Sequence, residues 1–438
     1  MRRRDFLAAG AASMAAASWP SRIAHAALTD AEVLAPAVRS SKNASAEAWA
    51  PVFSRLPPSL RGLIDDPQYQ VQLIWSRITR DARDLRGPPR LRRFEYGLTS
   101  RRWFSAASVS KLPMALLMAE RLSAHGLDAS AQIRLSAAPE TGEWPAEEPL
   151  SETFQRGCNR TFAVSENVPF NRWYEYLGAD AVHARLATLG YPDTRLIARL
   201  GSADRAANRR SGGGDLLAAD GRVLERTEAT TAAERRFPFG SAMAGSGWQN
   251  DDGSVMPGPR DFSYANFMPL ADSLGMLQAF VLPDTVPAKQ RWKIADPLRT
   301  QLLRTLALHP RDSDDPRYDE AEYHDGYARW FLVGDGKQRY PDGVQAPGKS
   351  GMAYGYLSEV AYLQDRDSGA ECLLAAAIHV NRDGIYNDDR YEYQSIGLPF
   401  LAALGRAVLD VERDDVERDD VEHDDVEHDE VEREETSR

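Results

Sequence analysis

A serine and a lysine three residues apart begin the most apolar helical segment of the chain. Ser108 and Lys111 stand at the start of "SVSKLPMALLMAERL". Residues three apart share one face of a helix, so Oγ and Nζ come within hydrogen-bond reach. Serine attacks a carbonyl carbon when a base takes its proton, and a desolvated lysine can be that base. The structural alternative is that Ser108 caps the helix and Lys111 extends to water.

Lysine usage favours the chemical interpretation. The chain has 53 basic residues, and only six of them are lysines. Arginine therefore serves almost everywhere that a plain positive charge is needed. Because a guanidinium stays protonated in proteins and an ammonium can lose its proton, a lysine at position 111 indicates a role in proton transfer.

Two further short motifs follow in the chain. The first is Ser165-Glu166-Asn167, and the second is Lys349-Ser350-Gly351. Each motif alone also fits a helix cap or the end of an edge strand. In this order, after a Ser-x-x-Lys motif, the two supply a proton donor and a second cation for acyl transfer to a serine.

This set of motifs resembles the serine β-lactamase and penicillin-binding protein superfamily, and most closely the class A β-lactamase-like proteins. The resemblance covers about residues 45–409 in the order of elements, and it is specific at the three motifs. It implies that Ser108 is the acylated nucleophile and that Lys111 helps to take its proton. It also implies that Ser165 relays a proton to the leaving nitrogen.

The resemblance implies substrate contacts as well. Asn167 helps to hold the substrate, and Lys349 places a positive charge opposite the substrate carboxylate. Ser350 and Gly351 lie on the strand beside the acyl group. The backbone N–H of the nucleophile and a second N–H, from the region of Met352 or Ala353, form the oxyanion site.

The chain departs from the family where the acyl-enzyme is hydrolysed. Class A enzymes use a loop glutamate with an asparagine four residues later. The comparable stretch, "GSADRAANRR", offers Asp204 and Asn208 at that spacing. Asp204 is therefore the candidate deacylation base and Asn208 the candidate substrate contact. Because aspartate is one methylene shorter, the alternative is that Asp204 is a loop residue and the acyl-enzyme persists. Glu166 also replaces the usual aspartate of the Ser-x-Asn motif.

The predicted fold is α/β, an α+β sandwich. Alternation predicts paired strands in "YQVQLIWSRI" and "RLRRFEYGL" near the start of the body. Further strands are expected near its end, in "YARWFLVGD", "VQAPGKSGM", "YLSEVAYLQD" and "ECLLAAAIHV", before a last helix over about 393–409. One antiparallel sheet built from both ends, flanked by helices and interrupted by an all-helical domain, is the simplest arrangement.

The N-terminus predicts export. Arg3 and Arg4 precede an alanine-rich run, and Ala-His-Ala comes before Ala27, as in a twin-arginine signal peptide. We expect a soluble periplasmic protein without a stable membrane anchor, exported by the twin-arginine machinery. The predicted segments are a signal peptide (1–26), a flexible lead (27–44), a sheet domain (45–107 and 328–409), a helical domain with loop insertions (108–327) and an acidic tail (410–438). The extra loops fall at about 205–262 and 309–345.

The tail accounts for the charge of the whole chain. Residues 410–438 hold 16 acidic residues and 4 arginines in a pentapeptide repeat, and their net charge of −12 equals that of the protein. One valine per five residues gives no continuous apolar face, so the tail is predicted to be disordered. The neutral body argues against nucleic acid as a partner.

No metal or cofactor is expected, because no cluster has metal-ligand spacing and no phosphate-loop motif occurs. Cys158 and Cys372 are expected to be buried thiols. Two functions share the predicted chemistry: a hydrolase of β-lactams or related amides, and a penicillin-binding or peptidase-like protein with slow turnover. A non-catalytic module that binds cell-wall peptide remains the third alternative.

Overall fold

The computed structural model describes residues 42–80, 87–99, 101–250 and 252–436, with side chains described for residues 47–418 within these ranges. The predicted signal peptide and nearly all of the predicted lead lie outside them. The main sheet has the strand order β13-β15-β16-β1-β2, with β14 also paired to β15. Its strands are β1 (Gln72–Thr79), β2 (Arg90–Tyr96), β13 (Val344–Gln345), β14 (Gly348–Ala353), β15 (Tyr356–Asp365) and β16 (Glu371–His379).

Strands from the two ends of the body meet in the middle of this sheet. β16 is buried along its whole length, as expected for an apolar run such as "ECLLAAAIH". It pairs antiparallel with β1 on one side and with β15 on the other. The predicted antiparallel sheet built from N- and C-terminal segments is therefore confirmed.

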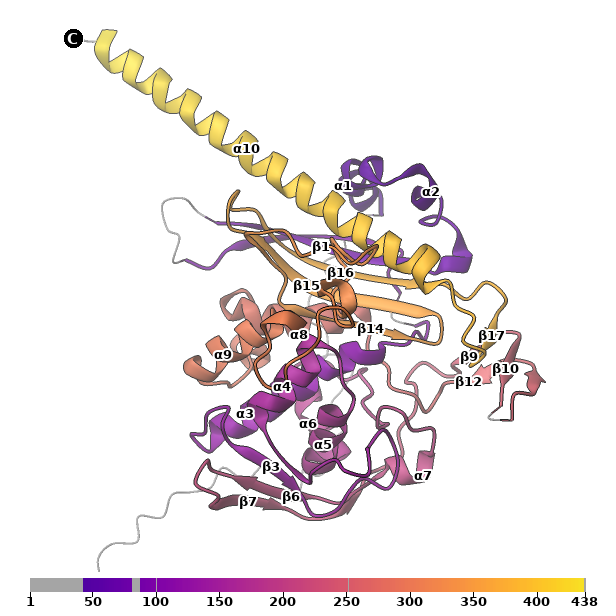
Figure 1. Ribbon diagram of the computed structural model, residues 1–438. Coiled ribbons are helices and arrows are strands. Elements are labelled where there is room, and N and C mark those ends of the chain that lie inside the picture. Colours follow the sequence, from indigo (N-terminus) through magenta and orange to yellow (C-terminus); the bar gives the residue numbers. More distant parts are fainter. Residues whose placement is uncertain (1–41, 81–86, 100, 251, 437–438) are drawn as a thin grey trace, which may run out of the picture. The chain divides into compact units, whose positions relative to one another are not determined.

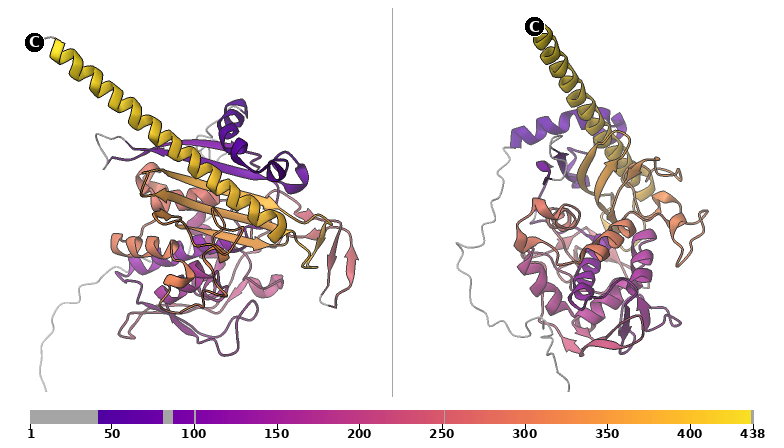
Figure 2. Two further views of the ribbon diagram at one scale, coloured as in Figure 1. Left: turned by 45° about the horizontal axis from the view of Figure 1, so that its top comes forward. Right: turned by 90° about the vertical axis from the view of Figure 1, so that its left-hand side faces the viewer.

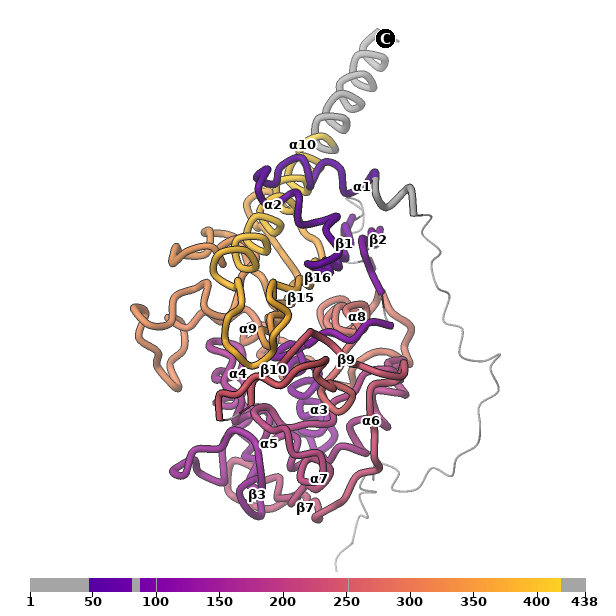
Figure 3. The backbone as a smooth tube through the Cα atoms, turned by 90° about the vertical axis from the view of Figure 1, so that its right-hand side faces the viewer, coloured from indigo at the N-terminus to yellow at the C-terminus, as the bar shows by residue number. Residues whose placement is uncertain are grey.

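Helices cover both faces of the sheet. The helices α1 (Lys42–Arg55) and α10 (Leu398–Thr436) lie together on one face, as Figures 1 and 3 show. The helix α8 (Leu270–Val281) packs on the opposite face against β1, β15 and β16. The core between the layers includes Trp49, Trp75 and Phe400, each at most 1% exposed.

Most of the longer elements in the segment between β2 and β13 are helices. Its longer helices are α3 (Lys111–Ala124), α4 (Phe154–Ala163), α5 (Val168–Leu177), α6 (Ala179–Thr188), α8 and α9 (Asp296–Leu306). The prediction of an all-helical domain was incomplete, because a four-stranded sheet with the order β4-β3-β6-β7 lies there (Figure 1). Its strands are β3 (Gln132–Leu135), β4 (Ser151–Thr153), β6 (Gly214–Leu217) and β7 (Val223–Thr227).

The region predicted as loop, about 205–262, contains short elements. They are α7 (Arg205–Asn208), β5 (Arg210–Ser211), β8 (Thr230–Thr231), β9 (Met243–Ala244), β10 (Gly247–Gln249), β11 (Val255–Pro257) and β12 (Arg260–Asp261). β10 also pairs in parallel with β17 (Ile385–Tyr386), so this region contacts the C-terminal part of the body. The remaining elements are α2 (Pro58–Arg61) and single turns of 3-10 or π-helix.

The strand predicted over 327–335 is absent. Its apolar run "YARWFLVG" forms a turn of 3-10 helix and a series of turns instead. The backbone N–H groups of Trp330 and Phe331 donate to the carboxylate of Glu359 on β15, at 3.0 and 2.8 Å. A side chain thus satisfies the donors that a strand neighbour would have bonded.

The C-terminus also differs from the prediction. α10 continues to Thr436, so disorder from Asp410 is wrong for the described tail. Val411 and Glu412 are 4% and 3% exposed, and Glu412 accepts a hydrogen bond from the indole of Trp75. The first part of α10 runs along the sheet domain (Figure 2). Residues 393–418 are long and apolar enough to cross a membrane by length and composition, but 67% of that window is buried inside the protein. This burial is typical of a core helix.

Candidate active site

Ser108 lies on a single turn of 3-10 helix, η2 (Ala107–Ser110), that leads directly into α3. Ala107, just before it, has φ of 43°, a left-handed conformation that is strained for a residue with a side chain. Such strain persists where the surrounding structure fixes the backbone, which is common at reactive residues. The side chain of Ser108 is half-buried, so a substrate can reach it.

Lys111 is the first residue of α3 and is fully buried. Its Nζ lies 2.8 Å from Ser108 Oγ and 3.2 Å from Ser165 Oγ, and it also bonds the carbonyl oxygen of Ser165. Burial, and next the charge of Lys349, hold the pKa of Lys111 well below its usual value. The side chain is thus a candidate base at hydrogen-bond distance from the candidate nucleophile.

Ser165 lies in the turn between α4 and α5, and its φ of 66° is again left-handed. This turn aims its hydroxyl between two lysines. Lys349 Nζ is 2.9 Å from Ser165 Oγ and 2.8 Å from the carbonyl oxygen of Ser350. A proton can therefore pass from either ammonium through Ser165 to an atom bound in the site.

Lys349 sits on β14 and is 3% exposed. Burial, and then the charge of Arg329, lower its pKa to about 7. Glu359 on the neighbouring strand is also buried, and burial raises its pKa to about 7. Lys349, Arg329 and Glu359 form a cluster of buried charges. The gain or loss of one proton in this cluster changes the charge next to Ser165.

The strand β14 approaches the nucleophile closely at Gly351. A Cβ at that position would lie 2.5 Å from the carbonyl oxygen of Ala106 and 2.7 Å from the N of Ser108. Only glycine allows this approach. Ser350 Oγ donates to the carbonyl of Ala328 at 2.6 Å, so the hydroxyl is held within the protein. The predicted oxyanion donor in the region of Met352 or Ala353, the last residues of β14, stays a prediction.

Glu166 braces the Ser165 turn through both of its carboxylate oxygens. Its Oε2 accepts from Arg160 Nε at 2.7 Å, and its Oε1 accepts from Tyr318 OH at 2.8 Å. Arg160 is 7% exposed and also bonds Glu148 and Glu152. Tyr318 belongs to the predicted extra loop at 309–345, so this loop contacts the back of the site.

Asn167 is the N-cap residue before α5 and donates from Nδ2 to Glu143 Oε2 at 2.7 Å. Sequence reasoning did not find Glu143, because it lies in an irregular segment without a motif. The sequence gives little reason to single out Glu143, because several other acidic residues lie in the same segment. The contact brings a carboxylate to the edge of the site that the three motifs define.

Asp204 and Asn208 have structural roles in the described protein. Asp204 Oδ1 accepts from the N of Ala207 at 2.9 Å and caps α7. Asn208 is 3% exposed and its Oδ1 accepts from the N of Arg199. Within the described residues, no hydrogen bond joins either side chain to Ser108, Lys111 or Ser165.

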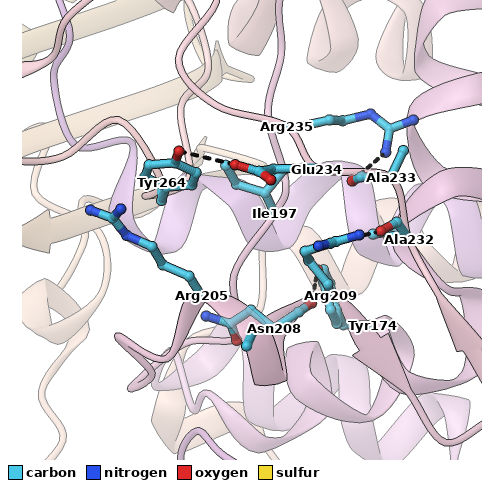
Figure 4. Close-up of a pocket in the computed structure, with 12 residues that line it drawn as sticks. Tyr174, Ile197, Arg205, Asn208, Arg209, Ala232, Ala233, Glu234, Arg235 and Tyr264 are labelled. Atoms are coloured by element: carbon cyan, nitrogen blue, oxygen red, sulfur yellow. Dashed lines mark hydrogen bonds between the residues drawn. The ribbon is translucent and has the colours of Figure 1, made fainter.

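Asn208 instead lines another pocket, of about 210 Å³ (Figure 4). Arg205, Arg209 and Arg235 surround it, but none of the motif residues does. The position of Asp204 as a cap provides no support for its predicted role, which stays a prediction. The structure therefore brings together Ser108, Lys111, Ser165, Lys349, Ser350, Gly351 and Asn167, and it leaves Asp204 and Asn208 apart from them.

The other groups that could react are the cysteines, a buried histidine and side chains that could bind a metal. Cys158 and Cys372 are buried free thiols, as predicted. Burial raises the pKa of both, so neither is an activated nucleophile. His379 lies 7% exposed on β16 and packs on Tyr356. In the part of the chain that the structure describes, no group of three or more His, Cys, Asp or Glu side chains could hold a metal ion.

Comparison with known proteins finds one family model that matches part of the chain. Residues 91–235, which contain the Ser-x-x-Lys and Ser-x-Asn motifs, match the sequence model of the beta-lactamase enzyme family. This part of the chain is similar to the beta-lactamase enzyme family, in line with the resemblance that the three motifs carry. A search of curated sequences finds no protein that matches the chain.

Solved structures of this superfamily are similar to the chain at low identity. A beta-lactamase from Sphaerobacter thermophilus is 14% identical, with 83% of this chain and 97% of that chain covered and a TM-score of 0.45. PBP-A is 13% identical, with 81% and 98% covered and a TM-score of 0.44.

Proposed function

We propose that this protein is a serine hydrolase that opens β-lactam or related amide bonds through an ester on Ser108. The observation that carries the proposal is the chain of contacts Ser108–Lys111–Ser165–Lys349, with distances of 2.8, 3.2 and 2.9 Å. It supplies a nucleophile, a base and a proton donor on rigid elements. A core lysine without catalytic use would be costly to bury.

The geometry supports the following acylation steps. Neutral Lys111 takes the proton of Ser108 as Oγ attacks the carbonyl carbon of the amide. The oxygen of the tetrahedral intermediate lies next to the N–H of Ser108 and an N–H of β14. The C–N bond then breaks, and the leaving nitrogen takes the hydroxyl proton of Ser165, which Lys111 or Lys349 replaces. The product is an ester between Ser108 and the substrate acyl group.

A second function is favoured by one observation. Among the described residues, no carboxylate hydrogen bonds to Ser108 or Lys111, and Asp204 is engaged as a helix cap. A protein that lacks a placed base for water would keep its acyl group. We therefore retain a penicillin-binding or peptidase-like protein with slow turnover as the alternative.

The cellular setting is part of the proposal. The paired arginines Arg3 and Arg4 and the small residues before Ala27 support export by the twin-arginine route. A periplasmic location is consistent with the proposed reaction, because β-lactams and cell-wall peptides are found there. The proposed substrate carries a carboxylate that Lys349 can receive.

The test is the intact mass of the full chain after exposure to benzylpenicillin, with the loss of the drug followed in parallel. Rapid drug loss that Ser108→Ala abolishes identifies a β-lactamase. A lasting adduct on Ser108 with little drug consumed identifies the slow-turnover alternative. No adduct and no loss contradicts both, and a fluorophosphonate probe of Ser108 then separates another serine hydrolase from a non-catalytic binding module.

A further inference from the structure

A cleft of about 580 Å³ opens where the first residue of β15 and the last residue of β16 meet the segment 101–103. Its further walls come from β9, from β17 and from the turn between β16 and β17. Figure 1 shows β9, β10, β12 and β17 grouped at this end of the main sheet. None of the residues of the Ser-x-x-Lys, Ser-x-Asn and Lys-Ser-Gly motifs lines the cleft.

The floor of the cleft is a run of buried rings. Trp103 stacks on Phe262 with 4.1 Å between ring centroids, and its ring meets the ring of Tyr356 edge-on at 5.6 Å. The ring of His379 lies 4.2 Å from that of Tyr356, and its Nε2 is 3.3 Å from the hydroxyl of Tyr386. Because each ring is held by the next, the floor keeps its shape without a ligand.

The walls are joined by backbone contacts. The N of Ser246 donates to the carbonyl of Gly384 at 2.9 Å, and the N of Gly384 donates to Asn381 Oδ1 at 3.1 Å. Arg382 follows Asn381 in this turn, and its carbonyl accepts from Gln68 Nε2 at 3.4 Å. The backbone that carries Arg382 is therefore fixed from both sides of the cleft.

Three arginines give the cleft its charge. Arg101, Arg102 and Arg382 line it and are exposed, and no aspartate or glutamate is among the lining residues. Within the described part of the chain, none of these three guanidinium groups forms an ion pair. The pocket of Figure 4 differs, since its Arg205 is paired with Asp261 at 2.9 Å. Three cations without a counter-charge make the potential in the cleft positive.

A buried donor at the floor also lacks an acceptor. Trp103 is 5% exposed, and its indole N–H has no hydrogen-bond partner among the described residues. Buried N–H groups are nearly always paired, so this one indicates that an acceptor is missing at the floor. The missing group and the arginines above it call for the same chemistry, which is an oxygen that carries negative charge.

We propose that this arginine cleft, defined by Arg101, Arg102, Arg382 and the floor at Trp103, binds an anion with two or more phosphate or carboxylate groups. A guanidinium donates two parallel hydrogen bonds to either group, and three guanidinium groups favour a ligand with more than one charge. The volume is in the range of pockets that hold small molecules. This site is separate from Ser108 and goes beyond the proposed function.

Isothermal titration calorimetry of the full chain with sodium pyrophosphate, and in parallel with sodium citrate, tests the proposal. At low salt we expect a Kd of about 1 mM or lower for at least one of the two anions. The tighter anion shows whether phosphate or carboxylate is preferred. Arg102→Gln and Arg382→Gln should each raise that Kd about fivefold, because each removes one charge-assisted contact.

Arg90→Gln is the matched control. Arg90 is exposed on β2 and does not line the cleft, so this variant removes the same charge and should keep the Kd of the parent protein. Ser108→Ala should keep it too, whatever the protein does with β-lactams. Failure of both anions to bind at about 10 mM would overturn the inference. An equal loss in Arg90→Gln and Arg382→Gln, or loss of binding in Ser108→Ala, would also overturn it.

Discussion

The nucleophile is positioned by close backbone contact with β14 at Gly351. A methyl group there would come within 2.5–2.8 Å of atoms of Ala106, Ser108 and Val109. These are backbone atoms, so the contact can be relieved only if the η2 turn or the strand moves. The position of Ser108 Oγ relative to Lys111 therefore depends on the absence of a side chain on the strand.

Gly351→Ala should lower the acylation rate by about 100-fold, because displacement near 1 Å has effects of that size. The rate is measured by intact mass with benzylpenicillin. Gly62→Ala is the control, since a Cβ at position 62 meets nothing within 4 Å and the residue is already helical. A rate within twofold of the parent protein in Gly351→Ala would show that the turn adapts easily.

The pKa of Lys349 predicts a fall of activity at alkaline pH. Burial and Arg329 lower this pKa to about 7, so the ammonium is lost as the pH rises through that value. The acylation rate constant for a carboxylate-bearing β-lactam should then fall roughly tenfold between pH 7 and 8.5, because the protonated fraction falls by that order. Below pH 7 this group does not limit the reaction.

Lys349→Arg separates charge from proton transfer. Arginine stays protonated, so the alkaline fall should disappear even though the absolute rate is lower. The check is a pH profile of the acylation rate constant for both proteins. A profile of the parent protein that stays level to pH 9 would contradict a functional role for the Lys349 charge.

At the scale of residues, the sequence predicted the contacts between side chains of a single motif. Ser108 and Lys111 were found because three residues of helix bring their side chains together. Glu143 was missed because its contact with Asn167 joins two segments 24 residues apart. Asp204 had the expected spacing to Asn208, but its side chain bonds its own helix N-terminus, as aspartate often does.

At the scale of elements, the Ser165 turn is held by a buried network of charges. Arg160 on α4 bonds Glu166 of the turn, Glu152 of β4 and Glu148 of the preceding segment. Glu152 is 6% exposed and also pairs with Arg172. The network links α4, α5 and β4 around the residue that relays protons.

Arg160→Met should lower the free energy of unfolding by about 3 kcal/mol, because Glu152 keeps its buried charge and loses its main partner. The measurement is urea unfolding. Arg160→Met combined with Glu152→Gln should recover part of the loss. Arg317→Met is the matched control, since the side chain of Arg317 is 84% exposed and its change should have little effect. Equal stability of Arg160→Met and the control would contradict the network's importance.

Elements with strong periodicity were predictable, and short ones were not. The ten-residue β15 and the nine-residue β16 follow apolar runs of the sequence. The second sheet was missed because its strands have only three to five residues and carry charged residues such as Arg134 and Glu225. The apolar run at 327–335 resembles a strand, yet Glu359 takes its N–H groups, which no local pattern reveals.

At the scale of the whole molecule, the C-terminal helix closes the sheet domain. The acidic repeat begins at Asp410, where composition predicted disorder. The first turns nevertheless pack: Val411 is buried, Glu412 bonds Trp75 of β1, and Arg413 Nε lies 2.7 Å from Asp365 of β15. Composition alone could not predict this packing. The burial of one valine and the hydrogen bond of one glutamate are enough to hold the start of the repeat against the sheet domain.

Two truncations separate the packed part of the repeat from the rest. A chain that ends at Arg418 keeps every described tail contact, so its free energy of unfolding should stay within about 0.5 kcal/mol of the full chain. A chain that ends at Leu409 loses the burial of Val411 and leaves the indole N–H of Trp75 without its acceptor. Its free energy of unfolding should fall by more than about 3 kcal/mol. Urea unfolding of both proteins checks this, with Glu412→Leu in the full chain isolating the Trp75 hydrogen bond. Equal stability of the two truncated proteins would mean that the repeat is dispensable from its first residue, as its composition suggests.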